Sequence, residues 1–261
     1  MKRFRMVSTT ALLFVFGNIG LAHAQPAQGR GQQGQNNQQG QQRAEQVHDR
    51  NDQRKSGQQQ RLSQQEQERR IQLAQRNMTA YQRNLNSQIR LSQQRTARLE
   101  QQKRMSQYRF QRDYYDRLRQ QQLGLQNVSN DNYNNDPFYY TASSLRYNRA
   151  GTYYQTNQYG ADLLRHAVNS GYQEGFRSGQ ADREDGWRSD YRGSYAYQDA
   201  NYGYGGRYVQ QDEYNYYFRE GFRRGYDDGF NTRNQYGTST NGNYGILGTV
   251  LSQILNLQSL R

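Results

Sequence analysis

Two stretches, GYQEGFRSGQAD (171–182) and YFREGFRRGYDDG (217–229), decide the fold because they carry the same ladder of glycines. A shift of 46 residues aligns a Glu-Gly-Phe-Arg motif at 174–177 with its second copy at 220–223. Residues four positions apart lie on one ridge of an α-helix, so each ladder predicts a helical ridge without side chains. The ladder residues are Gly171, Gly175 and Gly179 in the first copy and Gly221, Gly225 and Gly229 in the second.

The ladders predict two helices, over 158–185 and 212–232, that pack against each other. Bulky residues such as Phe176 and Phe222 lie beside the glycines. A ridge of small residues lets two helix axes approach closely. Three glycines cost each helix about 3 kcal/mol relative to alanine. We therefore expect a mutually dependent helical pair in which neither helix is stable alone.

Transmembrane packing is the main alternative for this spacing, because small residues four apart also mediate helix contacts in bilayers. The charges between the glycines argue against it, since a charge near the centre of a bilayer is costly. Glu174 with Arg177 and Glu220 with Arg224 have the i,i+3 and i,i+4 spacing of ion pairs on a solvated face. The sequence predicts a water-exposed polar face on each helix and no transmembrane helix in the mature chain.

The stretches GYQEGFRSGQADREDGWR (171–188) and YYFREGFRRGYDDGF (216–230) resemble the Gly/Tyr-rich C-terminal region of uncharacterised exported bacterial proteins. The resemblance covers about residues 160–245 and implies export without implying an activity. The glycine-zipper domains of some outer-membrane lipoproteins share the spacing, but those domains are apolar and this one is charged. No pore or membrane role is therefore transferred from them.

The first 24 residues have the organisation of a secretory signal peptide. Lys2, Arg3 and Arg5 precede a mainly apolar stretch, and Ala-His-Ala at 22–24 fits a cleavage site before Gln25. A membrane anchor, the alternative, needs about 20 unbroken apolar residues. The chain has no cysteine, hence no lipobox cysteine and no disulfide. We expect a periplasmic or secreted protein.

Composition divides the rest of the chain into segments, and the expected fold class is mainly α. Residues 25–57 are rich in Gln and Gly, which predicts disorder. Residues 58–126 are rich in Gln and Arg and lack proline, which predicts one long basic helix. After a linker at 127–157, a small Gly/Tyr-rich helical domain built on the two glycine-ridge helices occupies 158–245. An apolar C-terminal helix at 246–261 follows.

An apolar seam runs along the first part of the long helix. It consists of Ile71, Ala74, Met78, Tyr81 and Leu85, at heptad spacing. The seam covers about three heptads, fewer than a coiled coil ordinarily needs. A coiled coil that forms a homo-oligomer through 71–85 therefore stays an open alternative.

Tyrosine dominates the C-terminal half, where 20 of the 24 tyrosines lie after Asn130. Six of them lie in the glycine-containing stretch 187–211, between the two predicted helices. Because tyrosine combines an apolar ring with a hydroxyl, an exposed stretch would suit stacking on sugars or nucleobases. We expect this stretch to pack on the helical pair, since the domain otherwise has little to fill its core.

The net charge of +13 is concentrated in the N-terminal half of the mature chain. Residues 25–130 contain 19 Lys and Arg against 8 Asp and Glu, whereas residues 131–261 contain 13 against 14. Arginine favours bidentate contact with phosphate and carboxylate groups, although a charged helix often only remains solvated. The candidate polyanion-binding residues are Arg69, Arg70, Arg76, Arg83, Arg90, Arg95, Arg98 and Arg104.

Chemical motifs are few. His48 and His166 are the only histidines after residue 24, so no metal site or metal cofactor is expected. The acidic clusters at 182–185 and 227–228 lie among arginines on predicted helices, so we read them as solvated charge and name no catalytic residue. The sequence predicts an exported, non-enzymatic structural or adhesive envelope protein. The alternatives are a polyanion-binding module, for lipopolysaccharide, acidic polysaccharide or nucleic acid, and a Tyr-rich carbohydrate-binding domain.

Overall fold

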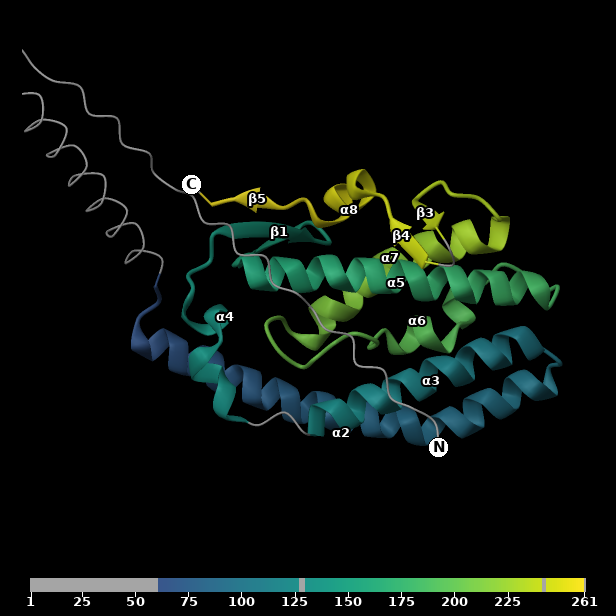
Figure 1. The fold of residues 1–261 in the computed structure, drawn as a ribbon, viewed down its shortest axis with the longest axis horizontal. Coiled ribbons are helices and arrows are strands. Elements are labelled where there is room, and N and C mark those ends of the chain that lie inside the picture. The colour runs from purple at the N-terminus through teal and green to yellow at the C-terminus, as the bar shows by residue number, and fades with distance from the viewer. Residues whose placement is uncertain (1–60, 127–129, 241–242, 261) are drawn as a thin grey trace, which may run out of the picture. The chain divides into compact units, whose positions relative to one another are not determined.

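The computed structural model describes residues 61–126, 130–240 and 243–260, and the predicted signal peptide and the Gln/Gly-rich segment 25–57 lie outside them. The described chain is mainly α, as predicted (Figure 1). Its α-helices are α2 (Gln64–Gln101), α3 (Met105–Gln126), α4 (Pro137–Tyr140), α5 (Gln158–Glu184), α6 (Tyr195–Asp199), α7 (Gln211–Asn231) and α8 (Gly248–Leu255). Two 3-10 helices, η1 (Asn130–Asn135) and η2 (Tyr191–Gly193), complete the helical elements of this part.

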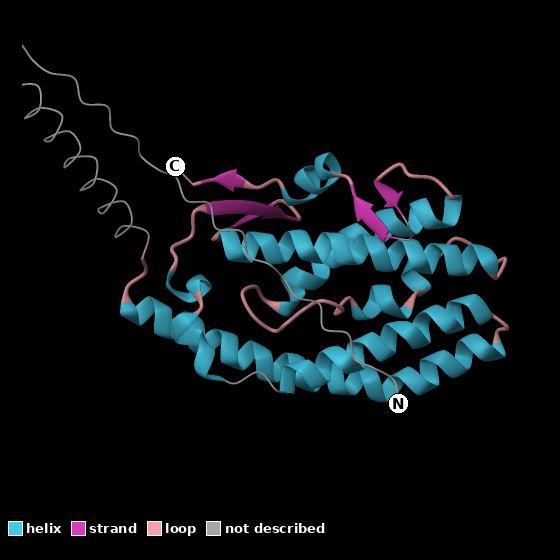
Figure 2. Ribbon diagram, viewed as in Figure 1, coloured by secondary structure: helices cyan, strands magenta, loops and turns pink. Residues whose placement is uncertain are grey.

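Short strands accompany the helices (Figure 2). One antiparallel sheet has the order β2-β1-β5, and a separate two-stranded ribbon pairs β3 with β4. The predicted linker 127–157 is structured from Asn130 on, where it contains η1, α4, β1 and β2. The predicted helix 246–261 is shorter, with a strand on either side. The strands are β1 (Leu145–Arg149), β2 (Thr152–Thr156), β3 (Gly237–Thr240), β4 (Asn243–Ile246) and β5 (Gln258–Ser259).

The predicted helix over 58–126 is two helices that form an antiparallel hairpin. The chain turns at Lys103, whose φ of 58° lies in the left-handed region and interrupts the helix. Across the hairpin, Arg95 of α2 donates to the Tyr115 hydroxyl of α3, and Gln121 donates to the Tyr81 hydroxyl. Nothing in the composition of this region marks the turn, because it lacks the usual glycine or proline.

The apolar seam of α2 is used inside the chain. Tyr81 and Leu85 are fully buried, and Leu99 is nearly so. The Tyr81 ring meets Tyr204 edge-on, with 4.8 Å between the ring centroids. Tyr81 and Leu85 therefore pack inside the chain, while Ala74 and Ile71 pack in a smaller cluster around Phe138. A homo-oligomer through 71–85 stays a prediction.

The helical pair is formed by α5 and α7, whose bounds fall within one residue of the predicted ones. A β-carbon added at any of the six ladder glycines would lie 1.9–2.3 Å from a carbonyl oxygen of the facing helix. Gly175 faces the Phe222 carbonyl, and Gly225 faces the Tyr172 carbonyl. The two backbones are thus in direct contact, and no residue other than glycine fits at these positions without moving the helices apart.

The two helices run parallel, because the facing partners keep a constant offset along the chain. Glycines of α5 face carbonyls 47 residues later, and glycines of α7 face carbonyls 53 residues earlier. The pair is therefore related by a shift of 50, which places Gly171 on Gly221 and Gly179 on Gly229. The shift of 46 that aligns the Glu-Gly-Phe-Arg motifs differs from this by four residues, about one helical turn.

The tyrosine-rich segment between α5 and α7 packs down, as expected. Tyr204 is fully buried between the hairpin and the pair, and its ring lies 5.0 Å from that of Tyr214 on α7. Its hydroxyl donates to the Val209 carbonyl at 2.8 Å. Figure 1 shows α6 in this segment between α3 and α5. Among residues 61–126, 130–240 and 243–260, no helix is both long and apolar enough to span a bilayer.

We expect Gly225→Ala to destabilise the protein by about 1–3 kcal/mol or more, because the new β-carbon would collide with the backbone of α5. Gly124→Ala on α3 is the matched control, since an added β-carbon there meets nothing within 4 Å. The control should be neutral or gain up to about 1 kcal/mol of helix propensity. Urea unfolding followed by circular dichroism measures both. Equal midpoints for the two variants would rule out the close backbone contact.

Candidate polyanion-binding face

The arginines of α2 and of the turn after it fall into two groups, one directed into the protein and one directed to solvent. Of the eight predicted candidates, Arg104 is buried, and Arg70 and Arg95 are half-buried. The remaining five, all on α2, are exposed: Arg69, Arg76, Arg83, Arg90 and Arg98. The predicted set therefore combines structural ion pairs with a solvent-facing group.

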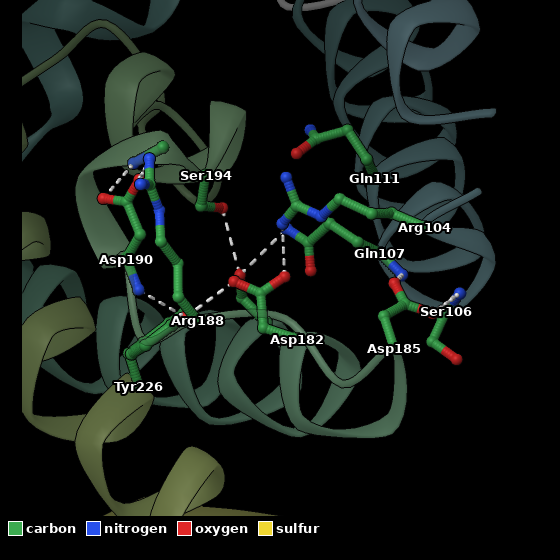
Figure 3. A network of polar contacts seen from close by, with 12 residues as sticks. Arg104, Ser106, Gln107, Gln111, Asp182, Asp185, Arg188, Asp190, Ser194 and Tyr226 are labelled. Atoms are coloured by element: carbon green, nitrogen blue, oxygen red, sulfur yellow. Dashed lines mark hydrogen bonds and ion pairs between the residues drawn. The ribbon is translucent and has the colours of Figure 1, made fainter. Parts of the chain in front are cut away.

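Arg104 binds a fully buried acid. Its guanidinium pairs with the fully buried carboxylate of Asp182, which also accepts a hydrogen bond from the Tyr226 hydroxyl at 2.6 Å (Figure 3). The Trp187 ring covers the same guanidinium, 4.5 Å from its carbon to the ring centroid. One arginine at the hairpin turn thus ties α5 and α7 to the hairpin.

Asp185 strengthens this junction by capping α3. Its two carboxylate oxygens accept from the backbone N–H groups of Ser106 and Gln107, at 2.8 and 2.9 Å. These groups belong to the first turn of α3, where backbone donors lack partners within the helix and a negative charge is favoured. Residues at the C-terminal end of α5 therefore stabilise the start of α3.

Two further buried carboxylates are also paired with arginines. Arg117 of α3 donates to the fully buried Glu174 at 2.6 Å, and Arg177 donates to the other oxygen of that carboxylate at 2.9 Å. Arg95 donates to Asp199 of α6 at 2.5 Å, and the Asp199 side chain is 1 % exposed. Arg70 instead donates to the carbonyls of Phe138 and Thr141, so it too has a structural role.

The predicted water-exposed face of α5 is wrong for its acids. Glu174 does pair with Arg177, but its carboxylate is buried against α3, and Asp182 is fully buried as well. Asp228 on α7 is also fully buried. The cause is a ridge of polar residues spaced by four that runs beside the glycine ridge and faces α3. Its members are Ser170, Glu174, Ser178 and Asp182. The four-residue spacing of these polar residues is visible in the sequence. Their burial could not be predicted from it, because it depends on the α2–α3 hairpin that covers them.

Burial dominates the electrostatics of these carboxyls. It raises the pKa of Glu174, Asp182 and Asp199 above the ordinary range, and the facing arginines oppose that rise. The Tyr226 hydroxyl also favours the charged form of Asp182. Taking a carboxylate out of water is costly unless it is paired and hydrogen-bonded. Arg117, Arg104 and Arg95 are therefore each required by the acid that they face.

The outward group forms a regular array on α2. Arg69, Arg76, Arg83 and Arg90 are spaced seven residues apart, and we call these four residues the arginine face. At about 1.5 Å per residue, neighbouring arginines are separated by about 10.5 Å and the face is about 32 Å long. No acidic residue occurs between Arg69 and Leu99. Within the described residues, none of the four forms an ion pair.

Comparison with known proteins does not identify a family for this chain. Neither the protein-family models, nor the curated proteins, nor the solved structures contain a match to this chain. Within the residues that the structure describes, no group of three or more His, Asp or Glu side chains is placed to hold a metal ion.

We expect Arg104→Ala to cost about 3–5 kcal/mol, because it leaves the buried Asp182 carboxylate without its partner. Arg112→Ala is the control, since Arg112 forms an exposed pair with Asp113 that should contribute at most about 1 kcal/mol. Urea unfolding near neutral pH compares the two. Similar losses would contradict a structural role for the Arg104 pair.

The loss caused by Arg104→Ala should shrink as the pH falls. Burial already raises the folded-state pKa of Asp182, and removal of Arg104 raises it further. A carboxyl with a raised folded pKa stabilises the folded state as the pH drops from that value towards the unfolded value of about 3.9. The deficit relative to wild type should therefore be largest at neutral pH. A constant deficit across this window would show that Asp182 is not the group responsible.

Proposed function

We propose that this protein is an exported, non-enzymatic structural or adhesive component of the cell envelope that holds a polyanion on the arginine face of α2. The observation that carries the proposal is a set of four exposed arginines at heptad spacing, in a stretch without acids and without an ion pair to any other described residue. Export is supported by the signal-like sequence of residues 1–24. The proposal assigns no reaction to the protein.

The regularity of the arginine face suits a linear ligand. Four positive charges along about 32 Å of one helix favour a chain with repeated negative groups over a single small anion. Two exposed glutamines, Gln72 and Gln94, lie about one helical turn after Arg69 and Arg90 and offer amide donors on the same side of α2. Lipopolysaccharide, acidic polysaccharide and nucleic acid all present such charges, and arginine contacts them in bidentate fashion.

The inward arginines support this assignment by holding α2 in place. Arg70 and Arg95 lie on the same helix as the arginine face, 25 residues apart, and each is tied to another element through hydrogen bonds. A binding surface that is ordered before the ligand arrives loses less entropy on binding. The arginine face is therefore presented on a fixed support, unlike charges on a flexible tail.

We expect replacement of the arginine face by glutamine (Arg69, Arg76, Arg83 and Arg90→Gln) to abolish most polyanion binding. With a fluorescent single-stranded oligonucleotide as probe, the slope of log affinity against log salt should decrease by about 3, at about 0.7 per lost contact. Anisotropy titrations at several salt concentrations give this slope. Pulldown on lipopolysaccharide and on an acidic polysaccharide then ranks the three polyanions.

The control removes the same charge elsewhere. Arg109, Arg112, Arg188 and Arg223 are exposed, and the last three each form an ion pair with an acid, which makes them poor sites for a second anion. Their joint replacement by glutamine should leave most of the slope intact. Equal losses in the two quadruple variants would mean that net charge, and not the arginine face, attracts the polyanion. Retention that resists salt would overturn the proposal altogether.

A further inference from the structure

A cavity of about 260 Å³ lies next to the arginine face, along the N-terminal half of α2. Its wall combines α2, through Arg70, Leu73 and Asn77, with the β1–β2 hairpin and the end of the tyrosine-rich segment at 206–210. The arginine face takes no part in the wall. The cavity therefore joins distant regions of the chain, and of the eight predicted polyanion-binding residues it includes only Arg70, which has a structural role.

Aromatic rings line this cavity in two pairs. Tyr147 and Tyr154 stack with 5.7 Å between ring centroids and 22° between ring planes. Phe138 and Tyr208 lie 4.7 Å apart at 33°. Tyr154 is 37 % exposed and presents its ring at the wall. Such flat surfaces suit the apolar face of a ring-shaped ligand.

The backbone at Tyr208 is held in an unusual conformation. Its φ of 71° lies in the left-handed region, which a large aromatic residue rarely adopts. The Tyr208 hydroxyl donates to Asp136 at 2.9 Å, which fixes the ring against Phe138. Strain of this kind persists where the surrounding structure enforces it, and it concentrates at binding sites.

The charged groups of the wall are already engaged in hydrogen bonds. Glu213 accepts from the Tyr147 hydroxyl at 2.5 Å and from the Gln210 backbone N–H, while Arg70 donates to two carbonyls and to Ser143. Within the described residues, the Asn77 and Gln155 amides and the Tyr154 hydroxyl have no hydrogen-bond partner. The wall thus offers neutral donors and acceptors beside aromatic rings, and no uncommitted cation for a phosphate.

We propose that this pocket binds one neutral sugar ring of a glycan. A pyranose has an apolar face for the Tyr154 ring and hydroxyls for the amides of Asn77 and Gln155. The cavity volume is smaller than the roughly 300–1,000 Å³ of sites for drug-sized ligands, which matches a single ring. A nucleotide fits less well, because its phosphate would find Arg70 engaged.

The test uses saturation-transfer NMR and calorimetry on the full chain, with glucose, N-acetylglucosamine, their β-1,4-linked dimers and adenosine as probes. High salt in the buffer suppresses binding to the arginine face. We expect one or more sugars to bind with a Kd of about 1 mM, which is typical of a ligand this small. Tyr154→Ala and Asn77→Ala should each weaken binding at least about tenfold, equivalent to about 1.4 kcal/mol.

Tyr153→Ala is the matched control, because Tyr153 is the neighbouring exposed tyrosine of β2 and is not part of the wall. Because Tyr153 does not line the cavity, this variant should bind as the wild type does. Thermal unfolding confirms that all three variants fold. No sugar binding, tighter binding of adenosine, or equal effects of Tyr153→Ala and Tyr154→Ala would each overturn the proposal. The arginine-face quadruple variant should still bind sugar, which separates this site from the polyanion site.

Discussion

The direct backbone contact between α5 and α7 is the constraint on which the rest of the structure depends. Because the glycines put carbonyl groups where side chains would otherwise lie, the pair buries almost nothing but backbone along its seam. Side chains of both helices must therefore find partners elsewhere. The aromatic residues Phe218 and Phe222 turn into the core, and the polar ridge of α5 turns towards α3.

The polar ridge of α5 explains why the α2–α3 hairpin packs against the α5–α7 pair. Glu174 and Asp182 are inside the protein, where an ionised carboxyl is costly, and their partners Arg117 and Arg104 come from a distant part of the sequence. Asp185 adds the cap of α3. The hairpin is thus held to the pair by charge and hydrogen bonds, while the tyrosine-rich segment fills the apolar space between them.

Three sides of helix α2 lie in three different environments. Its apolar seam packs on α3 and on Tyr204, its arginine face points to solvent, and its side towards Phe138 forms part of the aromatic cavity. A helix with 3.6 residues per turn separates these faces along one short stretch of sequence. The polyanion and sugar proposals therefore concern adjacent surfaces that substitutions can address separately.

Local pattern alone determined the two glycine-ridge helices, the mainly α fold and the absence of a bilayer-spanning helix in the described part, because periodicity and capping act within a few residues. The turn at Lys103 could not be predicted, since no local breaker marks it. Likewise, Arg83 and Arg95 look alike in the sequence, yet one is exposed and the other pairs with Asp199, 104 residues away. Only the tertiary structure decides which charges are covered, because burial is set by elements that are distant in the chain.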